Sequence, residues 1–219
     1  MKTVVFDLDG TLLDTLQSLA NCYNRVLSAH DLQTHEVAAY RNFIGNGARN
    51  CLLACLRASG ELTDLTDDHI DQLLDAQQQD YRQSWHQDVA IYPGIQDAIA
   101  DLQRRGMNLA VLTNKDHEFA ERCIRHFFPN QPFAYIQGFT AQVPHKPDPI
   151  GAQRIAEYFS CSAEETCLVG DTWVDVATAK RAGFKAIGVL WGFRGRSELV
   201  DAGADHIIST PADLADVVG

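Results

Sequence analysis

Short runs of apolar, often β-branched residues recur along the chain, and each run is followed by a turn and then by an amphipathic stretch. Four of them read TVVFDLDG, NLAVLTNK, ETCLVGDT and KAIGVLWG and cover residues 3–10, 108–115, 165–172 and 185–192. A shorter run, HIIS, covers residues 206–209. Strands that alternate with helices in this way form a parallel sheet with helices on both of its faces. The pattern therefore predicts an α/β core built on a parallel sheet.

A different pattern fills the long stretch between the first run and the second. Across residues 16–89, apolar positions recur three and four residues apart, as in SLANCYNRVLSAH, GARNCLLACLRASG and DDHIDQLLDAQQQDYRQSWHQ. That spacing is typical of amphipathic helices, and the stretch is too long for a single crossover. A YPG turn at residues 92–94 marks the return to the sheet. We therefore predict a Rossmann-like core of residues 1–14 and 90–219 with an inserted helical domain, residues 15–89.

Composition and charge narrow the range of partners. The formal net charge of −11 disfavours nucleic acid, because phosphate backbones attract clustered Lys and Arg. The six cysteines show no spacing typical of a metal site or a disulfide framework, so we expect free thiols in a reducing compartment. We see no secretory segment and no apolar run long enough to cross a bilayer. The expectation is a cytoplasmic protein, a monomer or a homodimer, with no nucleic-acid or membrane partner.

Reactive side chains follow the first apolar run. Asp7 and Asp9 stand at the carboxyl end of the predicted strand, which is the edge where open α/β sheets bind their ligands. The flanks of Asp7 are apolar, so burying its charge is costly unless a cation or a reaction partner balances it. For Asp9, a helix N-cap in an Asp-Gly-Thr turn is the alternative.

Three further segments bring polar residues to the same edge. LTNKD supplies Thr113 and Asn114, where a hydroxyl and backbone N–H groups can hold phosphoryl oxygens. HKPDP places Lys146 in an extended segment, and GDTWVD places Asp171 and Asp175 on one side of a starting helix. Each segment alone has an ordinary explanation as a cap or a solvated loop. Four segments in one order, each at the end of a predicted strand, are far more specific.

In this order FDLDGTLLDT, LTN, HKPDP and GDTWVD resemble the four motifs of the haloacid dehalogenase superfamily, phosphatase branch. The resemblance covers essentially the whole chain, because residues 15–89 also look like the helical cap domain of that family. It implies an Mg²⁺-dependent hydrolase that acts on a small phosphorylated metabolite through an aspartyl-phosphate. The dehalogenase branch lacks the second aspartate of the first motif, so the presence of Asp9 disfavours dehalogenation.

The resemblance also implies a role for each motif residue. Asp7 would be the nucleophile, Asp9 the general acid and base, and Thr113 and Lys146 would hold the transferring group. The metal ligands would be Asp7, Asp9 through its backbone carbonyl, Asp171 and Asp175. Four carboxylates and a substrate dianion require positive charge in one pocket, which Lys146 and a divalent cation supply. Oxygen ligands beside a phosphate favour Mg²⁺ over zinc.

The helical insertion carries the candidate specificity residues. FIGNGARN, residues 43–50, resembles the cap loop of phosphoglycolate phosphatases. Gly45 and Arg49 in this loop, with Asn114 of the core, are therefore predicted to bind substrate, and Arg49 could pair with a carboxylate. A solvent-facing arginine is the alternative for Arg49. The first candidate substrate is 2-phosphoglycolate; a sugar phosphomutase similar to β-phosphoglucomutase and a non-enzymatic phosphate-binding protein stay open.

Overall fold

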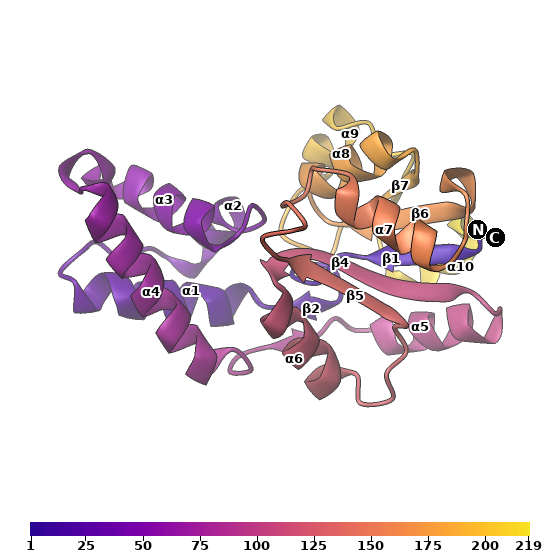
Figure 1. Cartoon of the computed structure of the whole chain (residues 1–219), viewed down its shortest axis with the longest axis horizontal. Helices are drawn as coiled ribbons and strands as arrows, with labels where there is room; N and C mark the ends of the chain where they lie inside the picture. The colour runs from indigo at the N-terminus through magenta and orange to yellow at the C-terminus, as the bar shows by residue number, and fades with distance from the viewer. The chain divides into compact units, whose positions relative to one another are not determined.

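The computed structural model describes all residues from Met1 to Gly219, and they divide into two compact units (Figure 1). One unit comprises Met1–Asp14 and Ala90–Gly219, and the other comprises Thr15–Val89. None of the helices is both long enough and apolar enough to cross a membrane. All six cysteines are free, as the sequence predicts.

A six-stranded parallel sheet organises the first unit, in the order β5-β4-β1-β6-β7-β8. The strands are β1 (Thr3–Phe6), β4 (Asn108–Asp116), β5 (Tyr135–Phe139), β6 (Thr166–Gly170), β7 (Lys185–Val189) and β8 (His206–Ile208). β1 lies between β4 and β6, and all four of its residues are buried, as is usual for a strand covered on both faces. The predicted parallel α/β core is therefore confirmed. From β1 the chain adds β4 and β5 on one side of the sheet and then β6, β7 and β8 on the other. The topological switch point, where the direction of strand addition reverses, therefore lies between β1 and β6.

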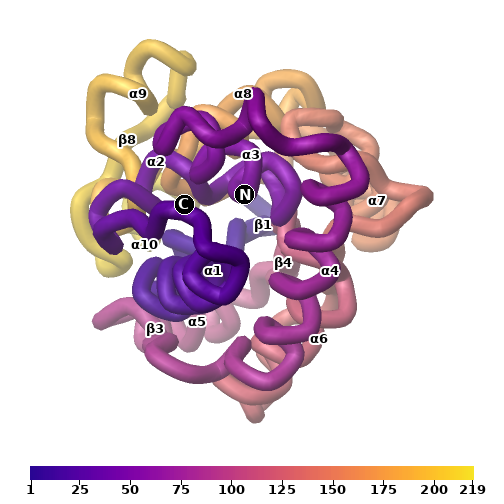
Figure 2. Tube along the Cα trace, turned by 90° about the vertical axis from the view of Figure 1, so that its left-hand side faces the viewer, coloured from indigo at the N-terminus to yellow at the C-terminus, as the bar shows by residue number.

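Helices cover both faces of this sheet, as Figures 1 and 2 show from two sides. One face carries α7 (Ile150–Tyr158), α8 (Trp173–Ala182) and α9 (Arg196–Asp201), and the other carries α5 (Ile95–Arg104) and α6 (His117–Phe127). The C-terminal α10 (Leu214–Val217) packs against α5, and short 3-10 turns η3 (Ala163–Glu165) and η4 (Pro211–Asp213) complete the unit. Apolar side chains of α7, α8 and α9 bury Val5 of β1 and Leu168 of β6. These helices therefore pack on both central strands two to three residues before Asp7 and Asp171.

Three strands have no counterpart in the predicted pattern. β5 lies at the sheet edge, and its interior residues Gln137 and Gly138 interrupt the apolar run that marks the other strands. β2 (Leu13–Asp14) and β3 (Ala90–Ile91) pair antiparallel where the chain leaves and re-enters the first unit. Two residues are too few for an alternating pattern to be recognised.

The second unit is helical. It contains α1 (Leu16–Ala29), α2 (Tyr40–Phe43), α3 (Ala48–Ser59) and α4 (Asp67–Ser84), with 3-10 turns η1 (Val37–Ala39) and η2 (Glu61–Asp64). The three helices that the apolar spacing predicts are confirmed as α1, α3 and α4. α1 and α4 lie side by side (Figure 1). Leu19, Tyr23 and Val26 on one face of α1 are buried, and Tyr23 stacks on Tyr40 of α2. Thr66 caps α4, since its side chain accepts a hydrogen bond from the His69 N–H at 3.3 Å.

Candidate active site

Two buried carboxylates lie at the switch point of the sheet. Asp7 directly follows β1, and its N–H donates to the carbonyl of Val169 in β6 at 2.9 Å, which extends the strand pairing by one residue. Asp171 directly follows β6 and is completely buried, while Asp7 is 7% exposed. The pairing of β1 with β6 therefore brings Asp7 and Asp171 together although they are far apart in the sequence.

Lys146 brings a positive charge into this carboxylate cluster. Its Nζ donates to Asp7 Oδ1 at 2.7 Å, to Asp175 Oδ1 at 2.6 Å and to the carbonyl of Leu112 at 3.0 Å. Burial lowers the pKa of Lys146, but the carboxylates of Asp175 and Asp7 raise that pKa by more, so the ammonium stays charged. The lysine is therefore a fixed cation between two carboxylates.

Asn114 holds the backbone of Lys146 in place. The side-chain oxygen of Asn114 accepts from the Lys146 N–H at 2.6 Å, and its Nδ2 donates to the Lys146 carbonyl at 3.1 Å. Asn114 thus links the end of β4 to the loop that carries the lysine. That Asn114 also binds substrate, as the sequence predicts, stays a prediction.

Asp175 uses its two oxygens differently. Oδ2 accepts from the N–H of Thr172 at 3.1 Å and from its hydroxyl at 2.8 Å, which caps the N-terminus of α8. Oδ1 faces Lys146. A Cβ on Gly170 would lie 2.2 Å from Asp175 Cγ, so only glycine leaves room for this carboxylate. The capping role and the place in the cluster are therefore compatible.

Asp171 is enclosed by two further glycines. A Cβ on Gly10 would lie 2.5 Å from Asp171 Oδ2, and a Cβ on Gly192 would lie 2.3 Å from Asp171 Cβ. The Asp171 oxygens accept from the hydroxyl of Thr11 at 3.3 Å and from the N–H of Phe193 at 2.7 Å. These contacts orient the carboxylate toward its neighbours in the cluster.

The donor set fits a divalent cation. Oxygens of Asp7, Asp171 and Asp175 lie within 4.8 Å of one another, and all three residues are buried. Burial raises the pKa of Asp7, and burial together with Asp175 and Asp7 raises the pKa of Asp171 well above its usual range. One ammonium does not offset three buried carboxylates. Carboxylate oxygens alone, without nitrogen or sulfur ligands, suit Mg²⁺.

A second lysine, Lys115, binds the remaining aspartate of the first motif. Its Nζ donates to Asp9 Oδ2 at 2.8 Å and to Asp9 Oδ1 at 2.9 Å. The side chains of Lys115 and Asp9 are 6% and 14% exposed. Lys115 is not among the site residues predicted from the sequence, although it follows Thr113 and Asn114 directly at the end of a predicted strand. The sequence did contain a signal for Lys115, because a cationic residue beside other polar residues at a strand end is a candidate site residue.

The other predicted site residues lie in two places. Thr113 is buried near the end of β4, and its hydroxyl accepts from the Lys115 N–H at 3.2 Å. Gly45 and Arg49 belong to the second unit. Gly45 has a φ of 121°, a backbone conformation that favours glycine, and Arg49 forms an ion pair with Asp71. The roles predicted for these residues stay predictions.

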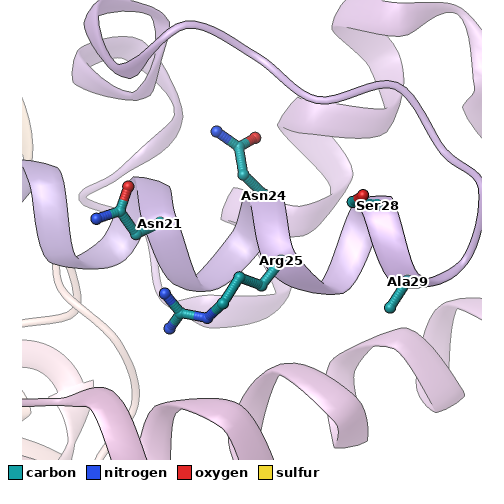
Figure 3. Close-up of a pocket in the computed structure, with 5 residues that line it drawn as sticks. All are labelled: Asn21, Asn24, Arg25, Ser28 and Ala29. Carbon is teal, nitrogen blue, oxygen red and sulfur yellow. The ribbon is translucent and has the colours of Figure 1, made fainter.

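The second unit also has a surface hollow. It measures about 480 Å³ and is lined from α1 by Asn21, Asn24, Arg25, Ser28 and Ala29 (Figure 3). The Arg25 guanidinium binds both oxygens of Asp80 in α4, at 2.8 and 2.5 Å. The charge of Arg25 is thus balanced within the helical unit, and we assign no reaction to the hollow.

Comparisons with known proteins identify the family and the fold. Residues 4–189 match the sequence model of the haloacid dehalogenase-like hydrolases. A phosphoglycolate phosphatase from Vibrio parahaemolyticus is 27% identical over 219 residues, which cover 100% of this chain and 96% of that protein. The solved structure of a predicted phosphoglycolate phosphatase from Haemophilus somnus matches with a TM-score of 0.92 at 24% identity. The match covers 100% of this chain and 98% of the Haemophilus somnus chain. A candidate β-phosphoglucomutase from Thermotoga maritima has a TM-score of 0.75 at 23% identity, with coverage of 100% and 98%. Structural likeness at these identities supports the fold.

Proposed function

This chain belongs to the haloacid dehalogenase-like hydrolases, and we propose that it is an Mg²⁺-dependent phosphatase that hydrolyses a small phosphomonoester. One observation carries the proposal, namely the buried cluster of Asp7, Asp171 and Asp175 with Lys146 at the switch point of the sheet. Phosphoryl transfer needs a nucleophile in line with the leaving group, a proton donor and positive charge near the phosphoryl oxygens. The cluster contains a candidate nucleophile, Asp7, and a positive charge, Lys146, and the neighbouring Asp9 is the candidate proton donor.

In the proposed reaction Asp7 is the nucleophile. One of its carboxylate oxygens attacks phosphorus while the bond from phosphorus to the alcohol oxygen breaks, which leaves an aspartyl-phosphate. Asp9 donates a proton to the departing oxygen and then accepts one from the water that releases phosphate. Lys146 and Thr113 bind the equatorial oxygens of the transferring group.

Asp7, Asp171 and Asp175 are the residues that would hold Mg²⁺, and the backbone carbonyl of Asp9 is proposed as a further ligand. When bound, the ion supplies positive charge that offsets the carboxylates and the phosphoryl oxygens. The fit is supported by the all-oxygen donor set. It is also supported by Gly10, Gly170 and Gly192, because a Cβ at any of these positions would collide with Asp171 or Asp175.

We propose 2-phosphoglycolate as the first candidate substrate. The proposal is supported by relatives named phosphoglycolate phosphatase that align along the whole chain. Residues 15–89 would act as the cap that selects the substrate, and Arg49 would bind its carboxylate. Because Arg49 pairs with Asp71, the substrate carboxylate would replace that partner.

A sugar phosphomutase is the second candidate, because the fold is also similar to a candidate β-phosphoglucomutase. Such an enzyme would return the phosphoryl group of Asp7 to a sugar rather than to water. The residues of the cluster serve both reactions equally well, so product analysis must separate them.

The deciding experiment measures phosphate release from 2-phosphoglycolate, sugar phosphates and nucleoside monophosphates, with Mg²⁺ and with chelator. We expect Mg²⁺-dependent release, strongest with 2-phosphoglycolate, and none from Asp7→Asn. Asp201→Asn, an exposed aspartate of α9 in the same unit, is the matched control and should keep full activity. Activity retained in Asp7→Asn would overturn the mechanism, and isomerised sugar phosphate in place of phosphate would favour the mutase.

A further inference from the structure

The strand that carries Thr113 departs from regular pairing at the end that faces the carboxylate cluster. In the register of β4 with β5, Leu112 pairs with Gln137, and the next pair is Asp116 with Phe139. Residues 113–115 of β4 therefore face Gly138 alone. A bulge of this kind redirects side chains and is common beside functional sites.

Gly138 makes the bulge possible. A Cβ at this position would lie 2.6 Å from the carbonyl oxygen of Lys115 and 2.6 Å from the Cα of His117. Because these are backbone atoms, a larger residue could not be accommodated by moving a flexible side chain. The glycine thus permits the close approach that sets the backbone direction at Lys115.

From the bulge, the side chain of Lys115 extends to the loop after β1. There its ammonium binds both carboxylate oxygens of Asp9, at 2.8 and 2.9 Å, in surroundings where both side chains are largely buried. Asp9 itself lies in a tight turn, since the next residue, Gly10, has a φ of 90° and its N–H donates to the Leu13 carbonyl at 2.8 Å. The turn fixes the backbone of Asp9, and the contact with Lys115 fixes its side chain.

Orientation of this side chain matters for the chemistry proposed above. A proton donor works only when its oxygen lies within hydrogen-bond reach of the leaving oxygen, and supporting residues must hold it to within about 0.5 Å. Lys146, the other cation of the site, binds Asp7 and Asp175 instead of Asp9. Lys146 therefore serves the carboxylate cluster, and Lys115 serves Asp9 beside it.

We propose that Lys115 is a positioning residue for phosphate-ester hydrolysis, holding the carboxylate of Asp9 toward the leaving oxygen from the bulge in β4. The inference rests on the proposed function, because it assigns Lys115 a part in the acid step of that reaction. Lys115 acts through Asp9 and does not itself contact the reacting atoms.

The test compares two leaving groups in the same variant. Lys115→Met removes the ammonium and keeps an unbranched apolar side chain. An alkoxide such as that of 2-phosphoglycolate needs a proton to leave, whereas p-nitrophenolate leaves without one. General acid catalysis contributes about 10²–10⁴-fold, so we expect Lys115→Met to lose about 10- to 100-fold in kcat/KM with 2-phosphoglycolate, at nearly constant KM. With p-nitrophenyl phosphate, kcat/KM should fall less than about threefold.

A double-mutant comparison tests the route through Asp9. Asp9→Asn alone should show the same dependence on the leaving group, and adding Lys115→Met to it should cause little further loss, because residues that act as one unit are not additive. Equal losses with both esters would indicate a merely structural role and overturn the proposal. A raised KM for 2-phosphoglycolate at unchanged kcat would also overturn it, since Lys115 would then bind the substrate carboxylate directly.

The same data separate this proposal from the proposed function. If the wild-type protein hydrolyses both esters and Lys115→Met shows no dependence on the leaving group, the phosphatase stands and the role of Lys115 falls. If the wild-type protein hydrolyses neither ester with Mg²⁺, the proposed function falls and the role of Lys115 falls with it. Thermal melting of each variant, compared with wild type, accompanies the kinetics.

Discussion

Replacing Lys146 with methionine should lower the free energy of unfolding by about 3–5 kcal/mol, the usual cost of removing one partner from a buried ion pair. Methionine retains an apolar stem but donates no hydrogen bond. The substitution therefore removes contacts of 2.7 Å to Asp7, 2.6 Å to Asp175 and 3.0 Å to the Leu112 carbonyl. The two carboxylates would then face each other without a cation in a buried site. The loss is large against the roughly 5–15 kcal/mol that stabilises a typical protein.

Urea unfolding followed by circular dichroism, first in chelator and then with Mg²⁺, measures this change. The matched control is Lys180→Met, because Lys180 binds Asp205 at the surface with 43% of its side chain exposed. Exposed pairs contribute roughly 0.2–1 kcal/mol, so this variant should unfold almost as the wild type does. Mg²⁺ should restore part of the stability of Lys146→Met, since the ion offsets the same carboxylates.

Activity provides a second measurement on the same variant. Lys146→Met should lose phosphatase turnover even with Mg²⁺, because the transferring group loses its fixed cation. The reasoning from burial and charge would be refuted if, in chelator, Lys146→Met unfolded within about 1 kcal/mol of the wild type, the range of an ordinary surface substitution.

Two further predictions follow from the carboxylate cluster. Gly192→Ala should destabilise the protein by about 1–3 kcal/mol and weaken Mg²⁺ binding, because the new Cβ would lie 2.3 Å from both Asp171 Cβ and the Gly10 carbonyl oxygen. Thermal melts with and without Mg²⁺ measure both effects. Gly195→Ala is the control, because no atom lies within 4 Å of its new Cβ. Equal melting temperatures of the two variants would contradict the prediction that the Cβ at position 192 collides with its neighbours. In chelator, the stability of the wild type relative to Asp7→Asn should fall as the pH rises from about 4 to about 7. The lower limit is the pKa of an aspartate in an unfolded chain, about 4. The upper limit is the pKa of about 7 to which burial raises Asp7 in the native state. The native state then holds a proton that the unfolded chain has lost; melts across this pH range check the sign, and a relative stability that rises would contradict it.

Much of the fold could be read from local patterns. Apolar strands alternating with amphipathic helices predicted the parallel sheet, and the spacing of apolar residues predicted α1, α3 and α4. The motif resemblance to the haloacid dehalogenase superfamily is confirmed by the family match. β5 escaped the prediction because Gln137 and Gly138 break its apolar run, and Gly138 is there for the bulge in its neighbour rather than for the strand itself. Local propensity is overridden at such a position by a tertiary requirement.

Sequence alone therefore determined that Asp7 and Asp171 stand at the ends of buried strands, because the order of polar and apolar residues is a local property of the chain. Only the tertiary structure decided which cation meets which carboxylate. Lys146 reaches Asp7 across 139 positions of sequence, and Lys115 reaches Asp9 across 106. These contacts depend on the order and register of the strands and on the bulge in β4, which arise from long-range packing that residue spacing does not encode.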